Sequence, residues 1–426
     1  MRKDRTCWWQ IAVTMLLTLV VALLVLNVSL GNKQVDERFS HLYSVSDPQF
    51  PRSLGASLGR ALVPGNRVDE LVNGEQIFPA MLAAIRGAER SITFETYIYW
   101  TGSTGREFSD ALVERARAGV KVHLLLDWIG GALDDALLER MEAAGIVIRR
   151  YNSPRWYNLH RLNNRTHRKL LIVDGEVGFT GGAGIADVWQ GDAQGPGHWR
   201  DTHFRAQGPV VSQLQAAFTD NWLHAAGEVL HGADYFPALS EQGTALSHVF
   251  TSAPGGGSES VQLMYLLSIT AATRSIDLSA AYFVPDDTAV AAIVAALRRG
   301  VRVRIILPGP YIDMPIVRRA SRARWGELLH AGAAIHEYQD TMYHCKLLVV
   351  DGLWVSVGST NFDNRSFVIN DEANLNVYDA DFARRQTAIF ERDLARSRQV
   401  TLAGWQQRAW TDKVLDVLAS LLGSQL

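Results

Sequence analysis

Two segments of this chain follow the same pattern: "HCKLLVVDGLWVSVGSTN", from His344 to Asn361, and "HRKLLIVDGEVGFTGGAG", from His167 to Gly184. Each has a histidine, a lysine two residues later and an aspartate seven residues after the histidine. Each then runs through a β-rich stretch into a pair of small residues. The two histidines are 177 residues apart, a domain-sized period that excludes short solenoid repeats.

The similarity between the two halves of the chain extends beyond these motifs. The segment "ERSITFETYIYW" at residues 89–100 has a counterpart, "TRSIDLSAAYFV", at residues 273–284. Aromatic and β-branched residues predict that both are strands. In each half a helix ending at a glycine, an apolar strand and a second helix come next, and the histidine pattern follows. Alternating strands and helices predict an α/β fold, here built twice.

We therefore predict two similar α/β lobes, each a mixed sheet flanked by helices, packed as a pseudo-two-fold pair. Their expected extents are residues 60–245 and 255–400, with a boundary in the turn-rich segment "TSAPGGGSES" at 251–260. Residues 401–426 carry apolar residues at helical spacing and are predicted to form a C-terminal amphipathic helix. Such a helix can pack on the domain or lie on a membrane surface.

Residues 1–31 are predicted to form an N-terminal transmembrane anchor. The stretch from Ile11 to Leu30 has no charged residue over about 20 positions, the length that a helix needs to cross a bilayer. The residues before it are typical of a cytoplasmic membrane boundary: Arg2, Lys3, Arg5, Trp8 and Trp9. A cleaved signal peptide is the alternative, but no small-x-small cleavage site follows. The positive-inside rule places the rest of the chain on the extracytoplasmic side.

The overall composition of the 426 residues is that of an ordinary globular protein, with 47% hydrophobic and 20% charged residues. A formal net charge of -2 argues against a surface shaped as a whole to hold nucleic acid. A cluster of four arginines is expected either to bind an anionic headgroup or to cover a solvated helix face: Arg318, Arg319, Arg322 and Arg324.

Strand geometry separates the members of each motif. Residues two apart on a strand share a face, so His167 and Lys169 point the same way and Asp174 points the other way. The second copy repeats this arrangement with His344, Lys346 and Asp351. The histidine and lysine can therefore reach one ligand, whereas the aspartate is expected to tie the Asp-Gly hairpin turn.

Two such edges set against each other would place two imidazoles and two ammonium groups around one site. The lysines would balance the charge of a phosphate, one histidine would attack phosphorus and the other would protonate the leaving oxygen. This chemistry requires no metal and no cofactor, because cationic side chains supply the electrostatics.

These motifs resemble the phospholipase D superfamily, in which HxK(x)4D(x)6GSxN occurs twice in a bilobal protein. The similarity is strongest to bacterial cardiolipin synthases and their phospholipase D-like relatives, and it covers most of the chain after the anchor. The first motif departs from the pattern at Gly182, where serine is expected, and at Gly184, where asparagine is expected. The resemblance implies a catalytic set with supporting groups around the phosphate: His167, Lys169, Asp174, His344, Lys346 and Asp351, with Gly182, Ser359 and Asn361.

The resemblance also implies a carboxylate beside each histidine, and the matching positions are Asp201 in "WRDTH" and Glu372 in "NDEAN". Such a carboxylate would fix the imidazole tautomer and stabilise the imidazolium. By the usual order in the superfamily, His167 is expected to be the nucleophile and His344 the acid and base.

The expected function is that of a membrane-anchored phosphatidyltransferase, which moves a phosphatidyl group between phospholipids such as phosphatidylglycerol. The implied partners are a phospholipid and a bacterial inner membrane, with no nucleic acid. The alternatives are a phospholipase D hydrolase, a superfamily nuclease, and a lipid-binding protein that has lost catalysis, the last suggested by Gly184.

Overall fold

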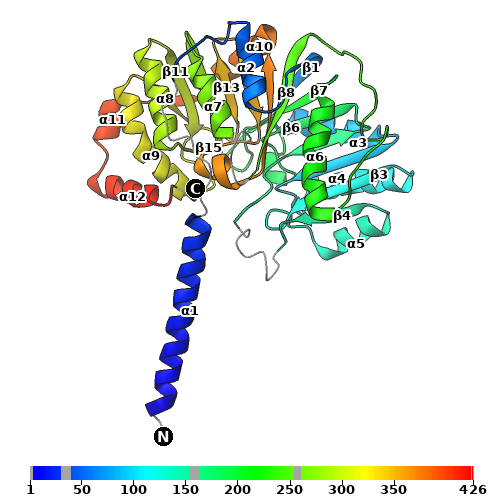
Figure 1. Ribbon diagram of the computed structural model, residues 1–426, viewed down its shortest axis with the longest axis horizontal. Coiled ribbons are helices and arrows are strands. Elements are labelled where there is room, and N and C mark those ends of the chain that lie inside the picture. The colour runs from blue at the N-terminus through cyan, green and yellow to red at the C-terminus, as the bar shows by residue number, and fades with distance from the viewer. Residues whose placement is uncertain (1–2, 30–39, 154–162, 254–260, 424, 426) are drawn as a thin grey trace.

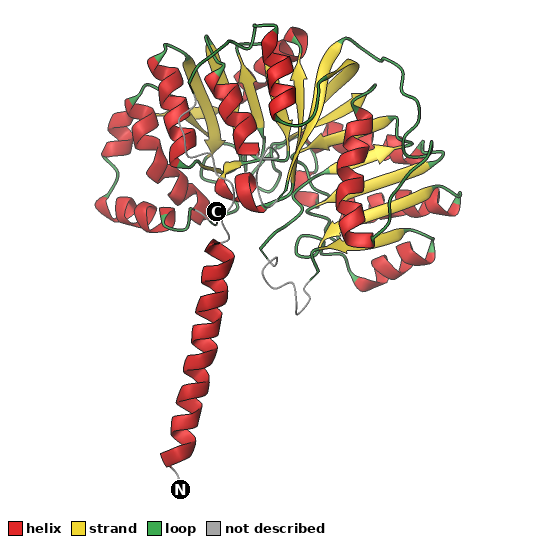
Figure 2. Ribbon diagram, in the orientation of Figure 1, coloured by secondary structure: helices red, strands yellow, loops and turns green. Residues whose placement is uncertain are grey.

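The computed structural model describes residues 3–29, 40–153, 163–253, 261–423 and 425, with side chains of the first helix described for residues 8–22 only. Within these ranges, 15 strands form one continuous mixed sheet with helices packed on it (Figures 1 and 2). An additional two-stranded parallel pair joins β10 (Phe283–Val284) to β15 (Phe362–Asp363). The chain is therefore an α/β protein, as the alternation of strand and helix patterns predicts.

Seven strands make up the first half of the sheet: β1 (Val63–Val72), β2 (Ser91–Thr96), β3 (Lys121–Asp127), β4 (Val147–Tyr151), β5 (Leu170–Val173), β6 (Val177–Gly181) and β7 (Thr202–Gln207). Eight strands make up the second half: β8 (Ala245–Ser252), β9 (Ser275–Ser279), β11 (Arg302–Pro308), β12 (Ala334–Tyr338), β13 (Leu347–Val350), β14 (Trp354–Gly358), β16 (Glu372–Tyr378) and β17 (Ser397–Val400).

The helices of the first part of the chain are α1 (Lys3–Ser29), α2 (Gln49–Ser57), α3 (Asn73–Arg86), α4 (Ser103–Arg117), α5 (Asp135–Ala143) and α6 (Val211–Ala226). Those of the second part are α7 (Val261–Thr270), α8 (Asp287–Arg298), α9 (Pro315–His330), α10 (Ala380–Ala395), α11 (Leu402–Gln406) and α12 (Trp410–Ser420). A 3-10 turn at Asp187–Trp189 and a π-helical turn at Arg365–Ile369 lie near the motifs.

The two halves of the sheet repeat one strand order outward from the central β1–β8 pair. The first half reads β1-β7-β6-β5-β2-β3-β4, and the second reads β8-β16-β14-β13-β9-β11-β12, with β17 added at its edge. The pairings correspond as well, since β2–β3 and β9–β11 are parallel and β2–β5 and β9–β13 are antiparallel. The repeated motif thus occupies the same place in each half: the histidine precedes β5 in one and β13 in the other.

The motif strands β5 and β13 are buried over their whole length, which explains their unbroken apolar sequences "LLIV" and "LLVV". Each half has a hydrophobic core of its own, and a third core lies between the halves. In this shared core Phe204 of β7 packs edge to face on Phe382 of α10, with 6.0 Å between ring centroids. Burial between the halves fixes their relative position.

The boundary between the halves differs from the expected one. β8 pairs with β16 from Leu246 to Ser252, so the second half begins at β8 and not within residues 251–260. The turn-rich segment begins with the last two residues of β8 and ends before α7, where the first half passes from β1 to α3. The turn residues at 251–260 therefore belong to a strand-to-helix connection within the second half, and not to a boundary between the halves.

The C-terminal residues form two helices, α11 and α12, where one was expected. Each of the four arginines in the cluster forms an ion pair with a carboxylate of the chain. The cluster is therefore neither an unpaired solvated face nor an open site for a headgroup. Arg319 and Arg322 bind Asp416 of α12, Arg318 binds Glu337, and Arg324 binds Asp287.

Helix α1 projects away from the rest of the molecule (Figure 1). Among the described residues, no helix combines the length and the apolar character that a membrane crossing requires. The predicted anchor, residues 1–31, lies partly outside the described residues.

Candidate active site

Backbone hydrogen bonds between the halves position the two motif histidines. The amide of His167 donates to the carbonyl of Asp371, 2.8 Å away, and the amide of His344 donates to the carbonyl of Arg200 at the same distance. Each histidine is thus joined to the residue that precedes the carboxylate of the opposite half. The two motif edges meet where the halves meet, as the duplicated pattern predicts.

The carboxylates cross between the halves. His167 Nδ1 lies 3.0 Å from each carboxylate oxygen of Glu372, and His344 Nδ1 lies 2.7 Å from Asp201 Oδ2. The histidine of the first half is therefore held by the acid of the second half, and the reverse. Because Nδ1 of each ring is engaged, Nε2 is the nitrogen that can react with a substrate.

A different set of groups supports each carboxylate. Glu372 accepts hydrogen bonds from Ser359 Oγ at 2.5 Å and from Ser366 Oγ at 2.8 Å. Asp201 accepts from Trp189 Nε1 at 2.9 Å and from the amide of Thr202 at 2.8 Å. Ser366 and Trp189 were not found by sequence reasoning, because neither stands at a position of the repeated motif.

The glycines of the first motif are consistent with the different hydrogen-bond donors of the two carboxylates. A Cβ on Gly182 would lie 2.2 Å from Asp201 Oδ1, so a serine cannot stand there as Ser359 does in the second half. The indole of Trp189 donates the hydrogen bond in place of that hydroxyl. A Cβ on Gly184 would lie 2.8 Å from the Cβ of Ile98, which also excludes an asparagine unless the backbone shifts.

Both motif lysines turn back toward their histidines. Lys169 Nζ donates to the carbonyl of His167 at 2.9 Å, and Lys346 Nζ donates to the carbonyl of His344 at 2.7 Å. Lys346 Nζ also lies 3.2 Å from both ring nitrogens of His344. Burial lowers the pKa of Lys169 to about 7 and also lowers the pKa of Lys346. Two desolvated lysines whose charges repel each other make this site favourable for an anion.

The charge state of the empty site follows from the same burial. Burial lowers the pKa of His167 to about 4 and that of His344 to about 3, although the neighbouring carboxylates oppose the shift. Burial alone would raise the pKa of Asp201 and Glu372, but the adjacent histidines and lysines outweigh it and leave both below their usual range. The empty site therefore has neutral imidazoles and ionised carboxylates near pH 7.

The motif aspartates do not reach this cluster. Asp174 accepts hydrogen bonds from the amides of residues 89, 90 and 91 at the start of β2. Asp351 does the same with the amides of residues 273, 274 and 275 at the start of β9. Both have a positive φ, 55° and 53°, a conformation that aspartate tolerates at a turn. They clamp the hairpin to the neighbouring strand, where the sequence suggested a bond within the turn, and the structure gives them no place in the catalytic set.

The imidazoles open into a cavity of about 340 Å³. Asn361 lines it, and its Oδ1 has no hydrogen-bond partner within the described part of the chain. The walls include aromatic and charged side chains from both halves: Tyr97, Trp100, Arg165, Lys169, Trp189, Trp199, Tyr282, Asp313, Asp363 and Arg365. The size suits a phosphate with its headgroup, while the acyl chains of a lipid would have to remain outside.

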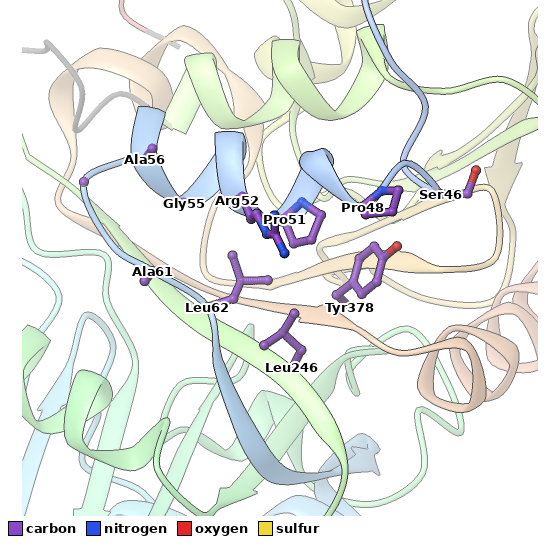
Figure 3. Close-up of a pocket in the computed structure, with 11 residues that line it drawn as sticks. Ser46, Pro48, Pro51, Arg52, Gly55, Ala56, Ala61, Leu62, Leu246 and Tyr378 are labelled. Carbon is purple, nitrogen blue, oxygen red and sulfur yellow. The ribbon is translucent and has the colours of Figure 1, made fainter.

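A larger hollow of about 930 Å³ lies elsewhere, between α2 and the central strands (Figure 3). Its lining is mainly apolar, with Arg52 and Tyr378 among the polar groups. None of the motif residues lines it, whereas both motif histidines line the smaller cavity.

Comparison with known proteins agrees with this arrangement. The family described as "Cardiolipin synthase, PLD-like domain" matches residues 81–187 and 265–394, one segment in each half. A cardiolipin synthase of Geobacillus kaustophilus is 35% identical over 360 residues, which cover 84% of this chain and 72% of the relative. Cardiolipin synthase A of Pseudomonas fluorescens is 35% identical over 348 residues, which cover 80% of this chain and 72% of the relative.

The fold is also similar to that of a solved phosphatidylserine synthase from Haemophilus influenzae. The TM-score is 0.70 and the sequence identity is 13%, with 88% of this chain and 100% of the other covered. The duplicated histidine and lysine motif, the crossed carboxylates and these matches lead to one conclusion. The chain belongs to the cardiolipin synthase family of phospholipase D-like enzymes.

Proposed function

We propose that the protein is a phosphatidyltransferase that joins two phospholipids such as phosphatidylglycerol through a phosphohistidine intermediate. The observation that carries this proposal is the crossed pairing of His167 with Glu372 and of His344 with Asp201 around one cavity. The relatives named as cardiolipin synthases support the choice of reaction. Water as acceptor would make the protein a phospholipase D hydrolase, the second candidate.

In the first step, Nε2 of neutral His167 attacks the phosphorus of the donor lipid. A P–N bond forms, the P–O bond to the headgroup glycerol breaks, and His344 gives a proton to the leaving oxygen. Since the pKa of His344 is about 3 in the empty site, this proton must be taken up as the anionic phosphate binds and offsets the lysines. Lys169 and Lys346 stabilise the negative charge of the phosphoryl oxygens in the transition state.

In the second step, a hydroxyl of the acceptor lipid gives its proton to His344, which is now neutral, and its oxygen attacks phosphorus. The P–N bond breaks, and His167 is regenerated as a neutral imidazole. Glu372 and Asp201 are positioning residues, because each holds a ring through Nδ1 and stabilises the positive charge that develops on it.

We also propose that residues 1–31 anchor the protein in a bacterial inner membrane as a single pass, with the active site outside the cytoplasm. The described part of α1 exposes large apolar side chains, among them Trp8, Met15 and Leu16. The basic residues before this stretch favour a cytoplasmic N-terminus. A reporter fused after the last residue should register the extracytoplasmic side, and cytoplasmic reporter activity would contradict this orientation.

Helix α12 also supports the membrane proposal. An ordinary surface helix turns its apolar face to the protein, whereas α12 exposes its apolar face and buries a charged residue. Asp416 faces the domain and is bound by Arg322 and Arg408. The opposite face is apolar and exposed: Trp410, Val414, Val417, Leu418 and Leu421. Ion pairs hold the charged face inward, so the apolar face is left for a lipid surface.

The position of α12 fits a lipid substrate. Ala419 of α12 packs with Val317, which lines the active-site cavity, and Gln425 just beyond α12 lines the same cavity. Figure 1 places α12 on the same side of the molecule as α1. A bilayer on this side would hold the acyl chains of a substrate while its phosphate enters the cavity.

The test of the reaction is direct. The protein in vesicles should be incubated with phosphatidylglycerol labelled in both glycerols, and the products identified by mass. Cardiolipin and free glycerol are expected. Phosphatidic acid as the main product would identify a hydrolase instead.

A further inference from the structure

Two arginines line the active-site cavity without a carboxylate partner. They are Arg165, two residues before His167, and Arg365 in the π-helical turn. Among the ion pairs between described residues, none includes either guanidinium, whereas the buried Arg168 and Arg200 bind Asp220 and Asp393. An arginine that is half-buried beside a cavity and forms no ion pair with a carboxylate is a candidate for binding an anionic ligand.

Neutral groups hold both guanidinium groups in place. Arg365 donates to the carbonyl of Asn163 at 3.1 Å, to its side-chain oxygen at 2.9 Å and to the carbonyl of Gln425 at 2.9 Å. Arg165 Nη1 donates to the hydroxyl of Tyr97 at 3.2 Å, and its buried Nε has no partner among the described residues. The positions are thus set while the two positive charges remain without direct compensation.

Arg165 lies close to the reacting centre, and Arg365 lines the same cavity. The hydroxyl of Tyr97 accepts from Arg165, and the ring of the same tyrosine lies 5.3 Å from the His167 ring, centroid to centroid. Lys169 Nζ lies 5.8 Å above the same ring. Burial, and after it the charge of Arg165, lowers the pKa of Arg365, and the charges of Asp363 and Asp127 oppose this shift without cancelling it. One tyrosine side chain therefore separates the nucleophile from a second cluster of positive charge.

The acidic side chains of the cavity do not neutralise this cluster directly. Asp363 accepts a hydrogen bond from the amide of Ser366, and burial raises its pKa to about 6. Asp313 accepts from the hydroxyl of Tyr282 at 2.6 Å. Neither carboxylate is ion-paired with an arginine in the described ranges, so an anion at the arginines would not have to displace an ion-paired carboxylate.

We propose that Arg165 and Arg365 form a second anion site, which holds the phosphodiester of the acceptor lipid while the lysines hold the phosphate being transferred. This inference rests on the proposed function and names its acceptor: an anionic phospholipid whose headgroup carries both a phosphodiester and a free hydroxyl. In such a glycerol headgroup three carbons separate the reacting hydroxyl from the phosphate. The two phosphates must therefore come close together, and their repulsion has to be offset by cations.

The same site would favour a lipid acceptor over water. Water and a neutral alcohol bring no charge to the arginines, so they gain nothing from this cluster. An anionic acceptor is bound and oriented by it, which increases the effective concentration of its hydroxyl at phosphorus.

The partition of the phosphoenzyme between acceptors tests the proposal. Vesicles of phosphatidylcholine with labelled phosphatidylglycerol are supplied with ethanol, and formation of cardiolipin and of phosphatidylethanol is measured together. Arg165→Gln and Arg365→Gln should each lower the rate of cardiolipin formation about tenfold to a hundredfold, the effect of losing charge-assisted hydrogen bonds. The rate of phosphatidylethanol formation should change less than about twofold, because that acceptor carries no phosphate.

Arg299 provides the matched control. Its guanidinium also bonds to backbone carbonyls, those of residues 269, 270 and 272, but it does not line the cavity. Arg299→Gln should leave both products unchanged. If the two site variants lose both products equally, the arginines act on the donor and the inference is wrong. If the parent protein forms neither product, the proposed function itself fails.

A binding measurement gives a readout that does not depend on turnover. Glycerol 1,3-bisphosphate carries two phosphates at the spacing of the expected product, and glycerol 1-phosphate carries one. The parent protein should bind the bisphosphate more tightly, by about tenfold or more, and Arg365→Gln should remove that advantage. Equal affinity of the parent for both probes would contradict a second phosphate site.

Discussion

Asp201 Oδ2 lies 2.7 Å from His344 Nδ1, although the two residues belong to opposite halves of the chain. The reciprocal pair, Glu372 with His167, has the same crossed arrangement. Neither half therefore contains a complete histidine–carboxylate pair of its own. Under the proposed mechanism, each half supports the imidazole of the other.

Replacement of the histidines is expected to remove turnover without unfolding the protein. His167→Ala should form no phosphoenzyme, and His344→Ala should be slower than the parent by roughly a hundredfold to ten-thousandfold. Mapping of the rapidly quenched parent, kept at neutral to alkaline pH because the P–N bond is acid-labile, should find phosphorus on His167. His231→Ala, an exposed histidine in the first half, is the control and should behave like the parent. An adduct on His344 would reverse the two roles.

Donor lipids with different leaving groups should distinguish the role of Asp201 from that of Glu372. Asp201→Asn and Glu372→Gln should each slow adduct formation from phosphatidylglycerol, by up to about 10⁴-fold, because the imidazole loses its tautomer and its counter-charge. A phosphatidyl donor with a p-nitrophenyl group needs no proton on its leaving oxygen. The p-nitrophenolate burst should therefore be largely restored in Asp201→Asn and remain slow in Glu372→Gln.

Equal restoration in both carboxylate variants would contradict the assignment of His344 as the acid. Each variant should melt close to the parent, since asparagine and glutamine keep the size of the side chains. A large loss of thermal stability in either one would show instead that the defect is structural.

Substitution of a motif aspartate should lower mainly stability, whereas substitution of a motif lysine should lower mainly activity. Asp351→Asn weakens three amide hydrogen bonds to a buried carboxylate and should cost about 1.5–3 kcal/mol of unfolding free energy. Lys169→Met should be nearly inactive yet melt at or above the parent temperature, since burial of its ammonium is unfavourable. Thermal melts and activities are to be measured on the same preparations. A catalytically dead Asp351→Asn with a parent-like melt would place that aspartate in the active site.

The lowered pKa of Lys169, about 7, predicts the pH dependence of substrate capture. Below this value the side chain is charged and binds phosphate, and above it the empty site loses one positive charge. The kcat/KM should therefore fall as the pH rises through about 7, while kcat should persist to higher pH because bound phosphate raises the pKa.

Lys169→Arg tests whether the fall in kcat/KM arises from the titration of Lys169, because a guanidinium stays charged from pH 6 to 9. Its kcat/KM, though reduced, should fall less steeply than that of the parent from pH 6 to 9, because only the proton that His344 takes up with the substrate remains to be bound. A profile of the parent that is itself flat over the same interval would rule out this role for Lys169. Because the imidazoles have pKa values of about 4 and 3, the acid limb should lie well below pH 6.5.

The exposed face of α12 should matter only when the substrate is in a bilayer. Leu418→Glu with Leu421→Glu should lower turnover of vesicle lipid at least about tenfold, since each leucine contributes roughly 1.5–3 kcal/mol when removed from water. Turnover of a short-chain, monomeric lipid should be unchanged. Gln399→Glu with Gln407→Glu adds the same charge at exposed positions off this face and is the control. Equal loss on both substrates would assign α12 a structural role.

Much of the architecture was determined by the sequence alone. Two copies of one motif, each after the same series of strands and helices, predicted an α/β fold with two similar halves. Period-two alternation on a strand also separated Lys169 from Asp174, because side-chain direction on a strand follows from local geometry. Local patterns such as these depend on residues a few positions apart, and one sequence is enough to read them.

The tertiary structure decided what depends on distant residues. Which carboxylate supports which histidine could not be predicted, because Asp201 and His344 are 143 positions apart and meet only when the halves pack together. The same holds for Trp189, whose indole stands in for a missing serine, and for Arg165 and Arg365, which come together in one cavity. Local sequence sets the direction of a side chain, whereas packing of the halves sets its partner.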